Sequence, residues 1–190
     1  SGGESGGTAG NLTGTFINCV GTIYCFGSSA TGTGGILSGT FIECIGQTYS
    51  FGYGNSSVLS GNFINCNCTG YSYCFGSVYI TATTLSGNFK YCIADTNSFG
   101  GGTTNAGGNL SGKFYYCEGG VTSFGSVTSG TCGTISGTFI ACIGGDYSFG
   151  STTPTLAGTG ATFSTAYLED CVGGASSFGS ADTTGGTFSV

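Results

Sequence analysis

The chain has 190 residues, of which 41 are glycine, 5% are charged and 14% are aromatic, and its net charge is −6. A typical soluble domain has about 25% charged residues and about 7% glycine, and a disordered chain combines low hydropathy with high charge. With a mean hydropathy of +0.25, the sequence therefore fits neither an ordinary mixed globular domain nor a disordered chain.

The charge and hydropathy patterns also limit the possible partners. Lys90 and Lys113 are the only basic residues, too few to neutralise a phosphate backbone, so no nucleic-acid partner is expected. No apolar run of about 18 residues predicts a membrane span, and no basic segment before an apolar stretch predicts a signal peptide. Because the chain begins with Ser1 and not with methionine, we expect it to be an excerpt of a longer polypeptide.

An internal repeat organises the chain. Residues 1–10 are glycine-rich, and we interpret them as the end of a preceding coil or a linker. The segment Leu12-Thr13-Gly14-Thr15-Phe16-Ile17-Asn18-Cys19 then returns with its cysteine at 44, 66, 92, 117, 142 and, more loosely, 171. We predict a repeat array over 11–184, with coils that start near residues 11, 36, 58, 84, 109, 134 and 163, and a further coil that starts within 185–190.

A second motif follows each of these cysteines. It reads Ser-Phe-Gly or Cys-Phe-Gly, and its phenylalanines are Phe26, Phe51, Phe75, Phe99, Phe124, Phe149 and Phe178. The phenylalanine follows the cysteine by 7 residues in every copy except the third, where it follows by 9. Other length variation falls in the Gly/Ser/Thr-rich stretches after each Phe-Gly, as expected of loops on a fixed scaffold.

The residue types predict an all-β fold. The repeat is rich in Thr, Phe, Ile, Tyr and Gly and not in the strong helix formers, and only one leucine recurs per copy, which argues against a leucine-rich repeat. We predict a parallel β-solenoid, or β-helix, of about seven coils with a repeat of about 25 residues and a rise of about 4.8 Å per coil. The rod would then be roughly 35 Å long.

Stacked coils place equivalent residues in columns. We predict a core of three columns: the first phenylalanines, the seven cysteines and the second phenylalanines. Strict strand alternation would put Phe16 and Cys19 on opposite faces, so we predict a bend between them, at the position of Asn18, Glu43, Asn65, Tyr91 and Asp170. The glycines two residues before the first phenylalanine and directly after the second are predicted to need positive φ or close backbone approach.

The cysteines suggest chemistry, but their spacing does not support a metal site. Zinc ligands need close spacing or histidine partners, yet histidine is absent and Cys66-x-Cys68 is the only close pair. We predict no metal and no cofactor. Neighbouring column cysteines would carry parallel Cβ atoms about 4.8 Å apart, too far for an ordinary disulfide, so buried free thiols are favoured. Cys25, Cys68, Cys74 and Cys132 lie outside the column, and Cys68 and Cys74, in the longer third coil, could close a local loop.

The acidic residues do not form a predicted active site. Counted from the column cysteine, Asp95 lies at +3, Glu118 at +1 and Asp146 at +4, and Glu43 and Asp170 share a position but lie five coils apart. A glycosidase needs two close carboxylates, a Ser-His-Asp triad needs histidine, and the glycine-rich loops lack a P-loop lysine. We therefore predict no catalytic residues and no enzymatic activity on these coils.

Two columns are expected on the surface. One contains Tyr24, Tyr49, Tyr73 and Tyr147, and the other contains Thr15, Thr40, Asn62, Asn88, Lys113 and Thr138. Exposed tyrosines suit carbohydrate or protein contacts, but a ladder that stiffens the sheet is the favoured interpretation. Asn and Lys interrupt the threonine column, which argues against ice binding. The sequons at Asn11, Asn55, Asn67 and Asn109 are expected by chance in a chain rich in Ser and Thr.

The repeat Gly-Thr-Phe-Ile-x-Cys-x-Gly-x-x-Tyr-Ser-Phe-Gly, clearest at 137–150, resembles the repeats of large fibre-like proteins of bacteriophages and other viruses. The resemblance covers 11–179, and in the irregular seventh coil Ala166 and Leu168 replace the Gly and Phe expected before the cysteine. It implies a tail fibre, tail spike or other appendage on a virion or cell surface, commonly a parallel homotrimer.

We therefore expect an extracellular or virion-surface structural shaft without catalysis, which associates with itself as a homotrimer or end to end. Two alternatives stay open. One is an adhesin that binds host glycans or a receptor through its Tyr or Thr columns. The other is the β-helix scaffold of a polysaccharide depolymerase.

Overall fold

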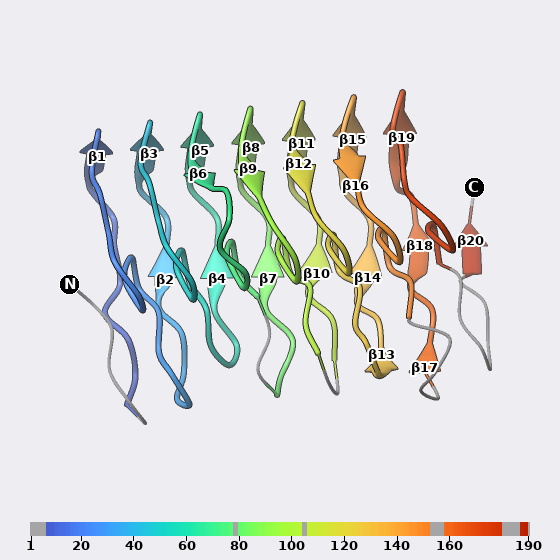
Figure 1. Ribbon diagram of the computed structural model, residues 1–190, viewed down its shortest axis with the longest axis horizontal. Coiled ribbons are helices and arrows are strands. Elements are labelled where there is room, and N and C mark those ends of the chain that lie inside the picture. The colour runs from blue at the N-terminus through green and yellow to red at the C-terminus, as the bar shows by residue number, and fades with distance from the viewer. Residues whose placement is uncertain (1–6, 78–79, 104–105, 153–157, 180–186, 190) are drawn as a thin grey trace.

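The computed structural model describes residues 7–77, 80–103, 106–152 and 158–179, and the backbone of 187–189. Short strands run parallel from coil to coil, and the coils stack along one axis with the two chain ends at opposite ends of the stack (Figure 1). The described residues contain no helix, and therefore none that could cross a bilayer. The predicted parallel β-solenoid is confirmed, with Thr15 paired to Thr40 one repeat later.

Two sheets run the length of the stack. The phenylalanine sheet contains β1 (Thr15–Ile17), β3 (Thr40–Ile42), β5 (Asn62–Ile64), β8 (Asn88–Lys90), β11 (Lys113–Tyr115), β15 (Thr138–Ile140) and β19 (Tyr167–Glu169). The leucine sheet contains β2 (Ile36–Leu37), β4 (Val58–Leu59), β7 (Thr84–Leu85), β10 (Asn109–Leu110), β14 (Thr134–Ile135), β18 (Thr162–Ser164) and β20 (Thr187–Ser189).

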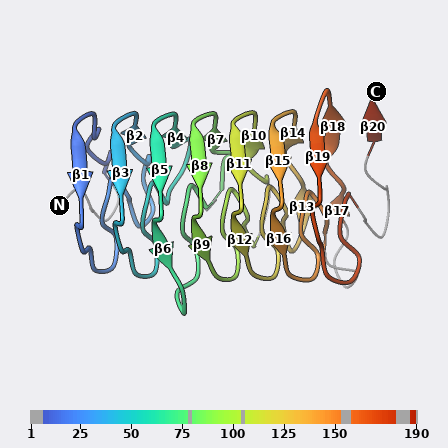
Figure 2. The same cartoon turned by 90° about the horizontal axis from the view of Figure 1, so that it is seen from above.

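Two shorter sheets complete the coils. The third sheet follows the column cysteines and contains β6 (Asn67–Cys68), β9 (Ile93–Ala94), β12 (Glu118–Gly119) and β16 (Ile143–Gly144). A two-stranded sheet pairs β13 (Gly130–Thr131) with β17 (Gly158–Thr159). Seen from above, the phenylalanine sheet and the third sheet follow one another along the same side of the rod (Figure 2).

The predicted core columns are confirmed by strand register and burial. Phe41 pairs with Phe63, and Phe63 pairs with Phe89. The first phenylalanines stack almost parallel, as between Phe63 and Phe89, whose ring centroids lie 4.8 Å apart with an interplanar angle of 3°. The second phenylalanines form their own stack, in which Phe75 and Phe99 are also 4.8 Å apart. All five of these side chains are fully buried, so both columns are continuous hydrophobic cores.

The predicted bend is also confirmed, and it has a defined backbone conformation. Every residue at this position has a positive φ: Asn18, Glu43, Asn65, Tyr91, Tyr116, Ala141 and Asp170, with values between 51° and 54°. Asparagine and aspartate tolerate the left-handed region better than other non-glycine residues. The left-handed residue reverses the strand alternation, and for this reason a phenylalanine and a cysteine three positions apart both face the core.

The two glycine columns have the two predicted roles. The glycine after each second phenylalanine has positive φ, as at Gly76 with φ 68°. The glycine before each first phenylalanine has no positive φ, but a Cβ at Gly61 would lie 2.0 Å from the carbonyl oxygen of Gly39. Close approach of successive coils therefore requires glycine there.

The seventh coil accommodates its irregular sequence with one extra residue. Phe163 pairs with Ile135 in the leucine sheet, and Leu168 pairs with Phe139 in the phenylalanine sheet. Five positions separate Phe163 from Leu168, against four between Ile135 and Phe139, and the added Thr165 has a φ of 56°.

Beyond the seventh coil, the backbone of β20 pairs in register with β18, Thr187 opposite Thr162. It therefore continues the leucine sheet. The remaining parts of the predicted end segments, residues 1–6, 185, 186 and 190, lie outside the described residues.

Candidate functional site

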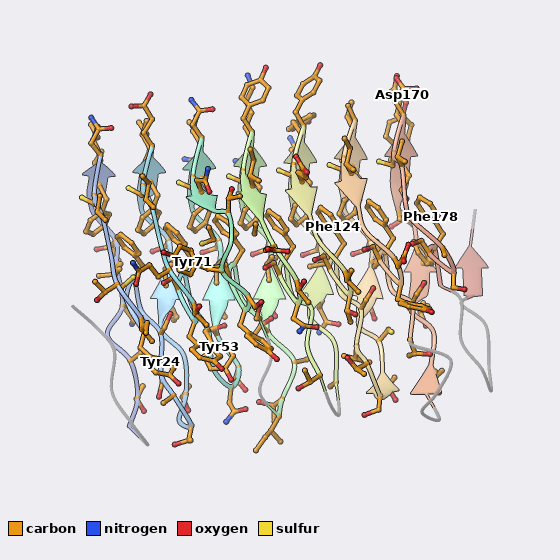
Figure 3. The ribbon with its side chains drawn as sticks, in the orientation of Figure 1. Tyr24, Tyr53, Tyr71, Phe124, Asp170 and Phe178 are labelled. Atoms are coloured by element: carbon orange, nitrogen blue, oxygen red, sulfur yellow. The ribbon has the colours of Figure 1, made fainter. Side chains whose placement is uncertain are left out.

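A cluster of tyrosines lies on one side of the first three coils. The rings of Tyr24 and Tyr49 stack 4.8 Å apart, and those of Tyr49 and Tyr73 stack 5.1 Å apart. Tyr53 packs against them at an angle, with its ring centroid 4.5 Å from that of Tyr49. Figure 3 shows Tyr24 and Tyr53 close together at this side of the rod. We call Tyr24, Tyr49, Tyr53 and Tyr73 the tyrosine cluster.

Local sequence explains why the cluster forms here. The three stacked tyrosines share one position of the repeat, and Tyr53 stands where coils 1 and 3 have Ser28 and Ser77. Tyr53 is buried, and the three stacked rings are half-buried. The three rings are therefore less exposed than the prediction of an outward-facing column implied. Asn97 and Thr122 occupy the same position in the next two coils and end the stack. Tyr147 in coil 6 therefore lies apart from the cluster.

The tyrosine cluster offers ring faces and phenol hydroxyls and no ionised group. Burial, and secondarily the neighbouring Tyr49, raise the pKa of Tyr24, and the same two causes raise the pKa of Tyr73. The phenols therefore stay protonated at neutral pH. Such a surface can stack against a sugar ring or an apolar side chain.

An exposed apolar ridge runs along the third sheet, and the sequence analysis did not identify it. The residue after each column cysteine points outward, and Val20, Ile45, Ile143 and Val172 are 74%, 46%, 49% and 58% exposed. Asn67 and Glu118 interrupt the ridge. The signal was present in the repeat, because this position is Val, Ile, Asn, Ile, Glu, Ile and Val in successive copies.

The threonine column faces outward as predicted, on the outer side of the phenylalanine sheet. Asn88 donates a hydrogen bond from Nδ2 to Oδ1 of Asn62 at 2.9 Å, which links two coils. On the same sheet, the ammonium group of Lys90 lies 5.1 Å from the centre of the Tyr91 ring. This column is polar and irregular.

The acidic residues do not converge. Glu118 pairs in register with Ile93 and Ile143, so no carboxylate lies beside it in the third sheet. Asp95 and Asp146 accept backbone hydrogen bonds, from the Thr96 amide at 2.8 Å and the Ala175 amide at 2.7 Å respectively. These carboxylates hold turns in place. Among the described residues, no three Cys, Asp or Glu side chains gather closely enough to hold a metal ion.

The sequon asparagines also have backbone partners. Asn11 accepts the amide of Ile36 at 2.9 Å, and Asn109 accepts the amide of Thr134 at 3.0 Å. Both bonds join one coil to the next, so these side chains contribute to the stacking.

The cysteine column is a row of thiols directed into the core. Cys66 donates to the carbonyl oxygen of Phe41 at 3.4 Å, and the same bond recurs between Cys92 and Phe63 at 3.3 Å. Burial raises the pKa of Cys44 to about 11. Outside the column, burial raises the pKa of Cys132 to about 12. Protonated, hydrogen-bonded and buried thiols of this kind are poor nucleophiles.

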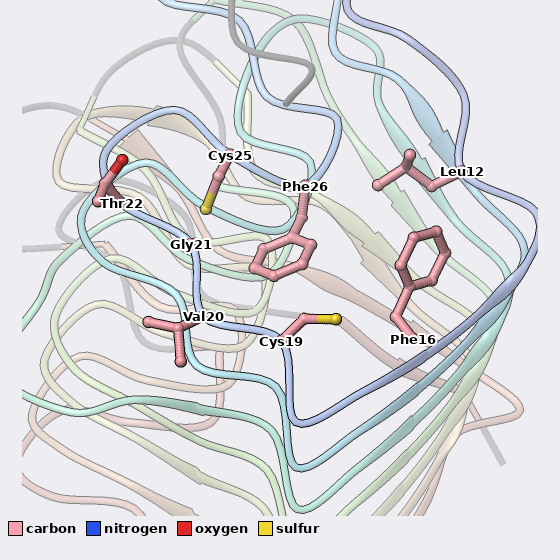
Figure 4. Close-up of a pocket in the computed structure, with 8 residues that line it drawn as sticks. All are labelled: Leu12, Phe16, Cys19, Val20, Gly21, Thr22, Cys25 and Phe26. Carbon is pink, nitrogen blue, oxygen red and sulfur yellow. The ribbon is translucent and has the colours of Figure 1, made fainter.

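The first described coil leaves the core columns open at one end. Leu12, Phe16, Cys19, Cys25 and Phe26 line a cavity of about 370 Å³ there (Figure 4). The equivalent residues of inner coils, such as Phe41 and Cys44, are fully buried by their neighbours. This face is equivalent to the one that each inner coil packs against the coil before it.

Together these features define a parallel β-solenoid with apolar, hydroxyl and aromatic surfaces. Comparison of the chain with protein families, with curated proteins and with solved structures finds no match.

Proposed function

We propose that this chain is a rigid, non-catalytic shaft segment of an extracellular or virion-surface fibre. The observation that carries the proposal is the unbroken parallel register of the phenylalanine sheet over seven strands. Each coil binds only its neighbours, so the number of coils sets the length of the rod.

The side-chain packing supports a mechanical role. Each inner coil contributes two buried phenylalanines, and rings from the two columns meet edge to face, as Phe63 and Phe75 do at 6.1 Å and 90°. Ring pairs of this kind contribute about 0.5 to 1.5 kcal/mol beyond their burial. Bending the rod would separate stacked rings and stretch the backbone hydrogen bonds on one side.

One surface supports self-association. The apolar ridge with Val20 and Val172 at its ends fits a lateral contact, as in a homotrimer. The resemblance to viral fibre repeats agrees with this arrangement.

Electron microscopy of a doubly tagged protein tests the shaft. Identical globular markers are fused to the two ends, and the control joins the same markers by a Gly/Ser linker of equal residue number, which behaves as a random coil. A rigid shaft gives one narrow distribution of marker separations. A distribution as broad as that of the linker control would refute the proposal.

The tyrosine cluster favours a second candidate function, adhesion to a glycan. Its stacked and tilted rings form an aromatic surface of four tyrosines across successive coils. A glycan array tests this with Tyr49→Ala and with the matched control Tyr147→Ala, which changes the same repeat position away from the cluster. Binding lost only in Tyr49→Ala supports adhesion through the cluster, and the absence of binding by the unmodified chain refutes it.

A further inference from the structure

The third coil contains two cysteines that face one another across a loop within the same coil. Cys68 ends β6, and Cys74 precedes the buried Phe75. Both cysteines are fully buried. Cys68 pairs in register with Ala94 of the next coil, and the thiol of Cys74 donates a hydrogen bond to the carbonyl oxygen of Gln47 at 3.2 Å. Both side chains belong to the same cluster of buried core residues.

Equivalent positions in other coils show that these two sites point directly at each other. The position of Cys68 is glycine in five coils, and the position of Cys74 is serine or cysteine in every coil. A Cβ placed on Gly46 would lie 2.6 Å from Cβ of Ser50, and one placed on Gly144 would lie 2.5 Å from Cβ of Ser148. A Cβ on Gly21 would lie 2.1 Å from the sulfur of Cys25. In these coils there is no room for a second facing side chain, and the fourth coil, also of the usual length, has only the small Ala94 opposite Ser98.

The third coil makes this room with its two additional residues. Cys68, Thr69, Gly70 and Tyr71 form a turn closed by a hydrogen bond from the Tyr71 amide to the Cys68 carbonyl at 3.1 Å. Gly70 has a φ of 77°, as the third residue of a type II turn requires. Asn67 accepts the Thr69 amide at 2.6 Å and holds the start of the turn. This loop projects from the rod beside β6 (Figure 2).

The column cysteines differ from this pair in geometry. Cys66 and Cys92 lie on successive parallel coils, and each donates to a phenylalanine carbonyl of the coil before it. Their side chains point the same way at the coil spacing, whereas a disulfide needs Cβ atoms about 3.5 to 4.5 Å apart with converging directions. The positions of Cys68 and Cys74 instead face each other within one coil, as the equivalent positions Gly46 and Ser50 do.

We propose that Cys68 and Cys74 are a site of intramolecular disulfide formation that staples the projecting loop of the third coil. The two thiols lose two protons and two electrons to a small-molecule disulfide such as oxidised glutathione, which is reduced to two thiols as the Cys68–Cys74 bond forms. Because both sulfurs are buried, exchange takes place when the exposed turn around Thr69 and Gly70 opens or before the coil closes during folding.

Thiol counting and peptide mapping test the site. The protein is incubated with oxidised glutathione, unfolded and alkylated, then digested without reductant. Nine of the eleven cysteines are expected to react with the alkylating reagent, and the remaining two are expected in one peptide pair linked through Cys68 and Cys74. Alkylation of all eleven, or a bond between two column cysteines in place of this one, overturns the proposal.

Cleavage within the loop gives an independent measurement. Tyr71 is 37% exposed in the turn, and chymotrypsin cleaves after tyrosine. The oxidised protein cut there is expected to stay joined until reductant separates two fragments, and fragments that separate without reductant contradict the staple.

Matched variants keep the result interpretable. Cys74→Ser introduces the residue that five other coils have at this position, and Cys68→Ala copies Ala94 of the fourth coil. Once the linkage has formed, reductant is expected to lower the melting temperature of the unmodified protein. Both variants are expected to lose the linkage and this reductant-dependent shift, whereas Cys132→Ala keeps both. A shift that persists in Cys74→Ser would show that it has another source and would refute the assignment.

Discussion

Phe114 and Phe124 meet edge to face in the fifth coil, with ring centroids 6.2 Å apart and an interplanar angle of 84°. Each also stacks with its own column, Phe114 on Phe139 at 4.6 Å and Phe124 on Phe149 at 4.6 Å. Every inner phenylalanine thus contacts rings above, below and beside it, and the core is one continuous aromatic lattice.

Truncation of one ring should therefore be costly. Phe114→Ala is expected to lower the free energy of unfolding by about 3 to 5 kcal/mol, because it leaves a cavity between stacked rings. Chemical denaturation followed by circular dichroism measures the change. Lys113→Ala, on the exposed face of the same strand, is the control and should change stability by less than about 0.5 kcal/mol. Equal effects of the two substitutions would contradict the proposed core.

The close approach of coils makes one glycine column intolerant of any side chain. Gly61→Ala is expected to destabilise the protein by about 1 to 3 kcal/mol or more, because its Cβ would overlap the coil before it. Gly14→Ala changes the same repeat position where the nearest side-chain atom lies 3.9 Å away, and it should be nearly neutral. Thermal unfolding of both variants checks the difference, and a neutral Gly61→Ala would argue against the observed spacing of the backbones.

The left-handed bend predicts a stabilising substitution. Ala141 has a φ of 51°, a conformation that costs an ordinary L-residue roughly 1 to 2 kcal/mol. Ala141→Asn should recover part of this cost, about 0.5 to 1 kcal/mol, since asparagine tolerates the left-handed region. Ala141→Ser, which adds a polar side chain at the same position without this tolerance of the left-handed region, is the control and should not stabilise. A loss of melting temperature in Ala141→Asn would count against the bend.

Buried thiols predict a loss of stability in alkali. The pKa of Cys132 rises from 9.0 in the unfolded chain to about 12 in the folded one, so its contribution is complete below pH 9 and is lost as the pH rises toward 12. In that window the unfolded state binds fewer protons, and the free energy of unfolding falls by about 1.4 kcal/mol per pH unit for each such thiol. Denaturation at pH 8, as the reference, and at pH 10 and 11, within the window, measures the slope. Cys132→Ala should make it shallower, and an unchanged slope would show that this thiol does not contribute.

The sequence could predict the fold and its main columns because the same residue types recur at nearly constant spacing. The bend at Asn18 and Glu43 followed from the alternation of side chains along a strand, since a phenylalanine and a cysteine three positions apart cannot share a face of a regular strand. The irregular seventh coil was recognised from Ala166 and Leu168, but its extra residue Thr165 was not.

The surfaces were harder to predict, for a physical reason. The direction of a side chain in the turns depends on backbone conformations that its residue type does not signal: Tyr49 and Phe51 both have positive φ, at 60° and 51°. The half-buried orientation of the tyrosines, and the role of Tyr53 beside them, follow from these turns. The ridge at Val20 and Ile45 was not predicted. The bend resets the alternation of side chains along the strand, and this determines that the residue after each cysteine faces outward.

A change in the number of coils tests the central claim most directly. A variant carries a second copy of residues 59–134 inserted after residue 134, which adds three coils in register. Small-angle X-ray scattering should show a maximum dimension longer by about 14 Å with an unchanged cross-section, since each coil rises about 4.8 Å. Growth in all directions, or a thicker cross-section at constant length, would contradict a rod built from stacked coils.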